Sequence, residues 1–269
     1  MIVTTDEQKK ALRAAGKILA GVLSDVGAMV KDGVSCAELD LAAEHAIRTR
    51  GAVPAFLGYT PAGSAHPYPA TLCVSINDEV VHGLPHAEKI LRNGDIVTLD
   101  AGLSYNGYFV DAARTLIVGS VVQFETTGEK SLAPSTADPQ AHKLVSATHE
   151  ALQGAIAAAR VGGRVGDIGA AIVRVARKYN LTPVEELGGH GVGESVHEKP
   201  FIPNSAGAGE GEVLKEGMVL AIEPMLAEGK GAIILDKDQW TYRMRDRKRA
   251  AHFEDTVILG KNGPEVLTA

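Results

Sequence analysis

The amino-acid sequence predicts an α+β fold with a doubled plan, and three observations support this prediction. Segments with helical spacing of apolar residues alternate in blocks with short β-rich segments, in the order helices, strands, helices, strands. Short stretches of the first half recur in the same order in the second half. Each half also carries a histidine and two carboxylates at matching places. We therefore expect one domain over residues 1–269, with pseudo-repeat halves at about 5–120 and 140–262.

The composition is that of a soluble globular protein. The chain has 269 residues, of which 45% are hydrophobic, so it can bury a sizeable core. Its net charge of −6 argues against non-specific binding to nucleic acid or to an anionic membrane, because both need a basic surface. There is no signal-peptide pattern and no apolar run near the ~18 residues that span a bilayer. We expect a cytoplasmic protein that binds neither nucleic acid nor membrane.

The use of cysteine fits a reduced cytoplasmic protein, because the chain has only two cysteines, Cys36 and Cys73. They are too few and too far apart for a disulfide framework or for a zinc site of the CxxC type. The chain also lacks the GxSxG, P-loop and HExxH patterns, which removes three common kinds of catalytic centre.

Helical periodicity predicts four helices. Thr4 and Glu7 have the spacing of a capping box at the start of the first helix, and Ser35 and Glu38 have it at the start of the second. The predicted helices cover residues 5–31, 35–51, 139–160 and 167–179. Residues 126–139 and 204–211 are rich in turn-forming residues and are predicted to be surface loops.

Five β-rich segments are predicted to be strands, and the internal repeat between the two halves lies in and around them. The predicted strands cover residues 71–76, 95–101, 108–118, 218–223 and 253–259. Residues 91–100 align with 214–223, residues 81–85 with 196–200, and residues 109–111 with 252–254. Each half thus offers a histidine, a carboxylate at the end of a strand and a second carboxylate opening a strand. These six residues are His82, Asp100 and Asp111 in the first half and His197, Glu223 and Glu254 in the second.

The segment around Asn106-Gly107 predicts a β-hairpin with a two-residue turn. If the loop is those two residues, Tyr105 faces Tyr108, and Asp100 and Asp111 are diagonal neighbours on one face of the hairpin. Their Cα atoms would then lie roughly 7–8 Å apart. Two carboxylates this close on a half-buried sheet repel each other and lose solvation, so they need protons or cations.

The four carboxylates together predict a metal centre. Acidic residues near strand ends are usually solvated, but matched positions in two halves argue against that interpretation for the whole set. No lysine or arginine stands in their immediate sequence neighbourhood, so one or two divalent cations are the simplest neutralisation. Two metals sharing carboxylates lie about 3.5–4 Å apart and hold a water between them.

Three histidines complete the candidate site. His190 stands among glycines, which let the backbone approach a site closely, and it has no counterpart in the first half. One imidazole among carboxylates suits Mn, Fe(II), Co or Zn. His82 and His197 precede the carboxylate strands and could donate to a substrate or a tetrahedral intermediate. A core role is an equally good interpretation of these two histidines from the residues alone.

Several motifs together resemble the type I methionine aminopeptidases of the bacterial form. The resemblance spans residues 5–262 and rests on Ser75–Pro85, the Asp100 and Asp111 pair, His190–Gly193, Ile222–Met225 and Phe253–Thr256. It implies a pita-bread (creatinase/aminopeptidase) fold, with two pseudo-symmetric halves around a dinuclear metal site. It also implies that Asp100 binds one metal, that His190 and Glu223 bind the other, and that Asp111 and Glu254 bridge the two.

The resemblance further implies the reaction and its substrate. The reaction would be metal-dependent removal of the initiator methionine from proteins and peptides with a small second residue, at the N-termini of nascent chains on the ribosome. Glu223 would carry the proton, while His82 and His197 would hold the substrate and its oxyanion. The methionine pocket would be walled by Tyr59, Tyr68, Cys73 and Trp240. We expect a monomer.

The sequence departs from the family pattern in three places. Val196 stands where an aromatic residue is more typical, residues 58–69 are a few residues longer than usual, and residues 119–140 form an insertion. Two alternatives stay open: an Xaa-Pro aminopeptidase-like hydrolase and a non-catalytic pita-bread binding protein. Prolidase and aminopeptidase P carry a long N-terminal domain for which this chain has no room. A binding protein would have lost metal ligands, and all five are present here.

Overall fold

The structure is a computed structural model that describes residues 1–61, 66–120, 122–124, 130–132 and 138–269. Residues 126–129 and 133–137 of the predicted loop 126–139 lie outside the described residues, as do parts of the insertion 119–140 and of segment 58–69. Within the part of the chain that is described, no helix is both long and apolar enough to cross a membrane.

The described residues form four helices and seventeen strands. The helices are α1 (Asp6–Gly27), α2 (Cys36–Thr49), α3 (Pro139–Ala158) and α4 (Val165–Tyr179). Nine strands form the main sheet, in the order β1-β4-β5-β16-β11-β9-β10, with β2 paired to β4 and β17 to β16. Their bounds are β1 (Val53–Pro54), β2 (Leu72–Ile76), β4 (Ile96–Tyr105), β5 (Tyr108–Ile117), β9 (Gly188–Gly191), β10 (Glu198–Pro203), β11 (Val219–Ile222), β16 (Glu254–Gly260) and β17 (Gly263–Val266).

Eight further strands form three small sheets. One sheet has the order β15-β12-β8, a second has the order β13-β14-β3, and β6 pairs with β7. Their bounds are β3 (Glu79–Val81), β6 (Val122–Phe124), β7 (Lys130–Leu132), β8 (Thr182–Pro183), β12 (Met225–Ala227), β13 (Ile233–Leu235), β14 (Tyr242–Met244) and β15 (Ala250–His252).

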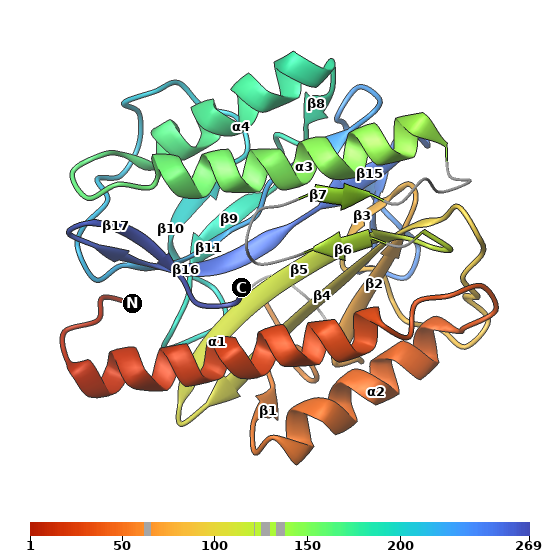
Figure 1. Cartoon of the computed structure of the whole chain (residues 1–269), viewed down its shortest axis with the longest axis horizontal. Coiled ribbons are helices and arrows are strands. Elements are labelled where there is room, and N and C mark those ends of the chain that lie inside the picture. Colours follow the sequence, from red (N-terminus) through yellow and green to blue (C-terminus); the bar gives the residue numbers. More distant parts are fainter. Residues whose placement is uncertain (62–65, 121, 125–129, 133–137) are drawn as a thin grey trace.

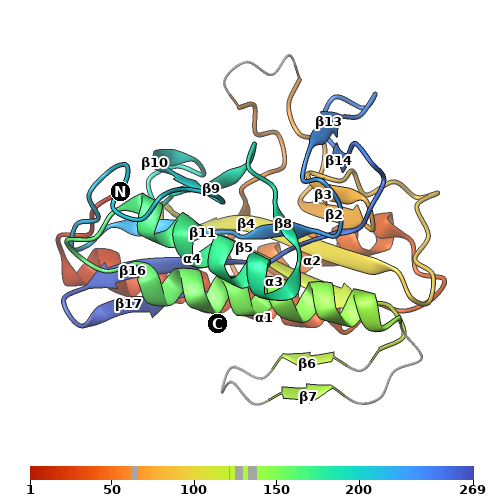
Figure 2. The same cartoon turned by 90° about the horizontal axis from the view of Figure 1, so that it is seen from above.

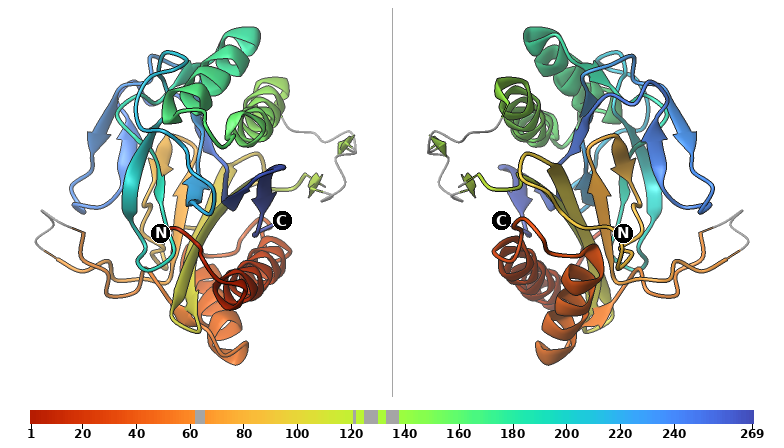
Figure 3. Two further views of the ribbon diagram at one scale, coloured as in Figure 1. Left: turned by 90° about the vertical axis from the view of Figure 1, so that its left-hand side faces the viewer. Right: turned by 90° about the vertical axis from the view of Figure 1, so that its right-hand side faces the viewer.

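The four helices cover the main sheet in two pairs. Helices α1 and α2 lie beside the strands of the first half, while α3 and α4 lie beside those of the second half (Figure 1). Seen from above, the helices lie on one side of the sheet and strands β3, β13 and β14 on the other (Figure 2). The end-on views show the same layering (Figure 3). One face of the sheet is thus buried under helices, which leaves the opposite face for a site.

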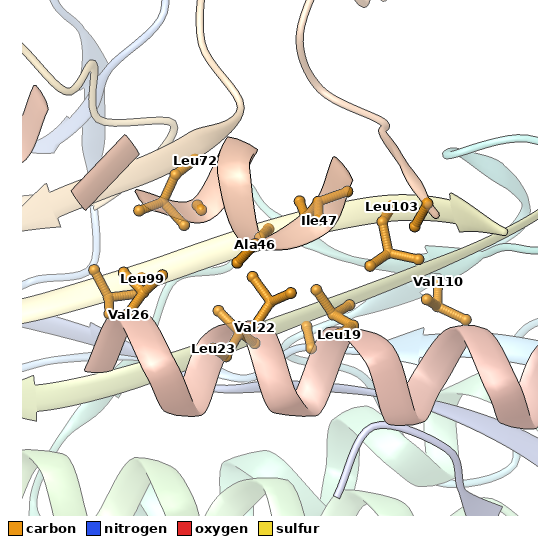
Figure 4. Packing of buried hydrophobic residues seen from close by; sticks show 14 of the residues in the cluster. Leu19, Val22, Leu23, Val26, Ala46, Ile47, Leu72, Leu99, Leu103 and Val110 are labelled. Atoms are coloured by element: carbon orange, nitrogen blue, oxygen red, sulfur yellow. The ribbon is translucent and has the colours of Figure 1, made fainter. Parts of the chain in front are cut away.

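Alternation along the central hairpin separates the core from that opposite face. Leu99 and Leu103 of β4 and Val110 of β5 belong to the core under α1, where Leu19 and Val22 pack among them (Figure 4). Successive side chains of a strand point to opposite faces, so the residues at the alternate positions of β4 and β5 face away from the helices. Those alternate positions include both carboxylates of the hairpin.

The helix limits agree with the prediction to within a few residues, with two corrections at α1. The capping box is formed by Thr5 and Gln8 and not by Thr4 and Glu7, because the Gln8 side chain accepts from both the Thr4 and the Thr5 backbone N–H. The helix ends at Gly27 and not near residue 31. Beyond Gly27, the backbone N–H groups of Met29 and Val30 donate to the carbonyls of Val26 and Gly27, three residues back, and so form tight turns that do not continue the helix. At α2 the predicted box of Ser35 and Glu38 is present.

The predicted hairpin register is confirmed. Tyr105 pairs with Tyr108, Asp100 with Ala113 and Gly102 with Asp111. Asn106 and Gly107 have φ angles of 51° and 82°, as the two-residue turn requires. Strand β4 is longer than predicted, however, because it continues to the turn at Tyr105, whereas β5 begins at Tyr108 as predicted. Asp100 therefore lies within a strand and not at its end, and only Glu254 opens a strand, namely β16.

Candidate metal centre

The strand register brings four carboxylates to one face of the main sheet. Ala113 of β5 pairs with Asp100 on one side and with Glu254 of β16 on the other, so these two acids share its face. Asp111 lies two residues before Ala113 and shares that face as well. On the other side of β16, Ile222 of β11 pairs with Asp255, so Glu223 is in line with Glu254 in the next row.

His190 reaches the same face through β9. It pairs with Ala221, which lies two residues before Glu223, and its Nε2 is 3.5 Å from Glu223 Oε1. The His190 Nδ1 lies 2.9 Å from the backbone carbonyl oxygen of Gly191. With Nδ1–H donating to that carbonyl, Nε2 keeps its lone pair on the side of the carboxylates, which is the orientation a metal ligand needs.

The glycines around His190 permit this close approach. A Cβ at Gly189 would lie 2.3 Å from the carbonyl oxygen of Ala221, and one at Gly191 would lie 2.2 Å from that of Lys199. Both distances are well inside van der Waals contact, so a side chain at either position would push β9 away from its neighbours. The glycine-rich sequence is therefore explained by the packing of the strand that carries His190.

The site contains buried polar atoms that have no partner. Among the described residues, Asp100 Oδ1, Asp111 Oδ1 and Glu254 Oε1 accept no hydrogen bond. Within that same part of the chain, no lysine or arginine forms an ion pair with Glu223 or Glu254, and the basic side chains that face these acids are imidazoles, at 3.4 Å or more. Buried acceptors and charges are nearly always compensated, so this set requires protons or cations. Asp111, His190 and Glu254 offer ligand atoms within 4.8 Å of one another, and these donors therefore fit a divalent cation.

The electrostatics of the metal-free site agree with this interpretation. Burial raises the pKa of Asp111 to about 7. Burial, together with the charge of Asp111, raises the pKa values of Asp100, Glu223 and Glu254 well above the usual carboxyl range. Without a cation, the four acids therefore retain protons at a pH where carboxyl groups are normally ionised.

His82 and His197 both line the open cavity next to these acids. Burial lowers the pKa of His82 to about 4 and also lowers that of His197, so both rings are neutral at pH 7. His197 Nδ1 lies 2.8 Å from the Tyr59 hydroxyl. In the tautomer where Tyr59 donates to Nδ1, His197 Nε2–H is free to donate to an oxyanion. His82 has a positive φ of 57°, a backbone strain of the kind found at functional sites.

A cavity of about 970 Å³ opens onto the carboxylates. Its lining includes all of the residues predicted to wall the methionine pocket. Tyr68 and Cys73 are buried and belong to one apolar cluster with Phe56, and Val196 is a member of the same cluster. Trp240 packs edge-on against Tyr68, with ring centroids 5.1 Å apart. A slot of this kind, apolar and lined by aromatic rings, suits a flexible thioether side chain.

One residue of the site, His252, was not predicted from the sequence. It lies at the end of β15, and its Nε2 is 3.4 Å from Glu223 Oε2 and 3.9 Å from Glu254 Oε2. Burial lowers its pKa to about 3. The available signal was its position two residues before Glu254, which places both side chains on the same side of an extended chain.

Comparisons with known proteins identify the family. Residues 10–261 match the model of metallopeptidase family M24. The chain is 46% identical over 259 residues to a methionine aminopeptidase of Aquifex aeolicus, which covers 96% of this chain and 94% of the relative. It is 41% identical over 266 residues to methionine aminopeptidase 1 of Mycobacterium tuberculosis, covering 96% and 91%. The chain belongs to the methionine aminopeptidases of family M24.

Solved structures of methionine aminopeptidases have the same fold. The methionine aminopeptidase of Thermotoga maritima superposes with a TM-score of 0.89 at 36% identity, covering 100% of this chain and 99% of that one. The prolidase of Pyrococcus furiosus, at 22% identity and a TM-score of 0.68, shows the fold alone, and this chain covers 65% of its length. The predicted pita-bread fold and the predicted resemblance are therefore confirmed, and the chain is a metallopeptidase.

Proposed function

We propose that this protein removes the initiator methionine from proteins and peptides whose second residue is small, with two divalent metal ions held by its carboxylates. The observation that carries the proposal is the single face on which four unneutralised acids and His190 meet beside an apolar slot. Co, Mn, Fe(II) and Zn all suit this donor set. The cations, when bound, activate the attacking water and polarise the scissile carbonyl.

Two groups of residues would bind the metals and the methionine side chain. Asp100 would hold one metal, His190 and Glu223 would hold the other, and Asp111 and Glu254 would be shared by both. The methionine side chain is held in the apolar slot walled by Tyr59, Tyr68, Cys73 and Trp240.

Three residues act on the reacting groups. His82 and His197 border the open cavity and donate to the substrate carbonyl as negative charge develops on its oxygen. Glu223 takes the proton of the attacking water and delivers it to the leaving amine. The Tyr59 hydroxyl, 2.8 Å from His197 Nδ1, fixes the orientation of that imidazole.

The proposal extends to the whole chain, its substrates and its location. The catalytic unit is the whole chain of residues 1–269, with pseudo-repeat halves at about 5–120 and 140–262. Its substrates are the N-termini of nascent proteins and peptides at the ribosome, and it works as a monomer in the cytoplasm. Neither nucleic acid nor a membrane takes part.

The test is hydrolysis of three peptides by metal-stripped protein, before and after addition of Mn or Co. Met-Gly-Met-Met should release methionine only with metal, while Leu-Gly-Gly and Ala-Pro-Ala should be left intact. Preferred cleavage of Ala-Pro-Ala would instead support an Xaa-Pro aminopeptidase. No cleavage with any metal, and no stoichiometric metal bound, would support a pita-bread binding protein.

A further inference from the structure

His252 carries a buried imidazole that no hydrogen bond from the described part of the chain reaches. His252 is 1% exposed to solvent, and among the described residues neither its Nδ1 nor its Nε2 has a hydrogen-bond partner. A buried polar atom without a partner is uncommon, and two on one ring require an explanation. No ordinary packing role supplies one, because an apolar residue of similar size would fill the space without the desolvation cost.

The backbone of His252 is fixed relative to the carboxylates. The Thr115 hydroxyl accepts from the His252 backbone N–H at 3.2 Å and donates to the His252 carbonyl oxygen. Thr98 Oγ1 lies 2.8 Å from Thr115 Oγ1 and completes this buried chain. Thr115 belongs to the same strand as Asp111, so two hydroxyls of the central hairpin hold the strand end that carries the imidazole.

The ring nitrogen faces two of the acids at separations longer than hydrogen bonds. His252 Nε2 is 3.4 Å from Glu223 Oε2, while His190 Nε2 is 3.5 Å from Glu223 Oε1. Each oxygen of the Glu223 carboxylate thus faces a different imidazole. Two donors that each bind one cation at about 2.1 Å in tetrahedral geometry lie roughly 3.4 Å apart. The observed separations therefore fit donors that share a cation.

The donor atoms also form a compact group. Glu223, His252 and Glu254 offer ligand atoms within 4.8 Å of one another, as Asp111, His190 and Glu254 do. Glu254 belongs to both groups. We propose that His252 is a sixth protein ligand of the dinuclear centre, which binds metal together with Glu223 and Glu254. The inference rests on the proposed metal-dependent function.

A second imidazole changes which metals the centre prefers. Carboxylate-rich sites suit Mn, whereas imidazole suits Zn and Fe, and Co binds a given site more tightly than Mn does. With His252 as a ligand, the centre has two nitrogens among four carboxylates, and Zn or Co should be held more tightly relative to Mn than in a site with His190 alone.

The test is direct metal binding by metal-stripped wild type, His252→Gln, His190→Gln and His45→Gln. Glutamine keeps a hydrogen-bond donor at position 252 but lacks the imidazole nitrogen. His45 is exposed on α2 and serves as the matched control. Calorimetric titration with Co(II) should show at least about 10-fold weaker binding at one of two sites for His252→Gln, and no change for His45→Gln.

X-ray absorption of the Zn-loaded protein counts the imidazoles directly and needs no variant. Two imidazoles per pair of zinc ions in wild type support the inference, and His252→Gln and His190→Gln should each lose one. One imidazole in wild type, or an unchanged count in His252→Gln, would overturn it while leaving the dinuclear centre in place. Failure of wild type to bind stoichiometric metal would overturn the proposed function as well.

Discussion

Replacing Asp111 by asparagine should stabilise the metal-free protein at pH 8, although it removes a proposed metal ligand. Burial raises the pKa of Asp111 from 3.8 to about 7. A carboxyl group with a raised pKa in the folded state binds more protons there than in the unfolded state. Its contribution to stability is therefore complete below about pH 4 and is lost as the pH rises through about 7. About three pKa units at about 1.36 kcal/mol each give a cost of about 4 kcal/mol at pH 8.

Asparagine is neutral at every pH and has nearly the same shape, so it avoids this cost. Urea unfolding followed by circular dichroism, in the presence of a chelator, should give Asp111→Asn a free energy of unfolding up to about 4 kcal/mol above wild type at pH 8. At pH 4 the difference should nearly vanish. Asp25→Asn, which breaks an exposed ion pair with Arg50, is the control and should change stability by less than about 1 kcal/mol.

Added Co(II) should reverse the order of stabilities at pH 8. Wild type gains stability through binding, whereas the variant, which lacks a bridging ligand, gains far less. A metal-free variant at pH 8 that is no more stable than wild type would refute the reasoning that the buried acids are uncompensated. Equal stabilisation of both proteins by Co(II) would refute the bridging role of Asp111.

Four further substitutions test the site and the core. His197→Ala should lower kcat for Met-Gly-Met-Met by about 10²–10³-fold with unchanged metal content, as loss of one oxyanion donor does; an unchanged kcat would exclude that role. Tyr59→Phe should lower kcat about 5-fold, since the lost hydrogen bond contributes about 1 kcal/mol. In α1, Gly16→Ala should destabilise the fold by roughly 1–3 kcal/mol, because the new Cβ would lie 2.1 Å from the Leu267 carbonyl oxygen. Gly21→Ala, whose nearest neighbour would be 3.8 Å away, should instead stabilise it by about 0.5–1 kcal/mol in thermal unfolding.

The parts of the fold that follow from local chemistry could be predicted from the sequence. The capping box at Ser35 and the turn at Asn106-Gly107 depend on residues a few positions apart, and both are present as predicted. The short strands could not be predicted in the same way. Strand β9, for example, consists of three glycines and His190, and it exists because β10 and β11 pair with it from both sides. Its hydrogen bonds come from distant residues, which leave no local pattern.

The part of the candidate site that depends on the register of the central hairpin could be predicted from the sequence. The two-residue length of the hairpin turn fixes the register of β4 against β5, and this register places Asp100 and Asp111 on one face. Ala113 also pairs with Glu254 of the second half, so Glu254 lies on the same face. How the two halves join could not be deduced from the sequence, since no local signal specifies that β5 pairs with β16. The repeat predicted matching acids, and only the pairing of these two central strands brings them together.

His252 could not be predicted from the internal repeat. The alignment of the two halves matches His252 with Phe109, an apolar residue, so a search for polar residues present in both halves passes over it. His190 also lacks a counterpart in the first half, but the glycines beside it indicated a backbone that approaches a site closely. Both imidazoles face the carboxylate of Glu223, one on each oxygen. The doubled carboxylate frame is thus common to both halves, while the nitrogen donors come from the second half alone. In the proposed two-metal site, the symmetric acids would hold two cations, and the unmatched histidines would make the two metal positions chemically different.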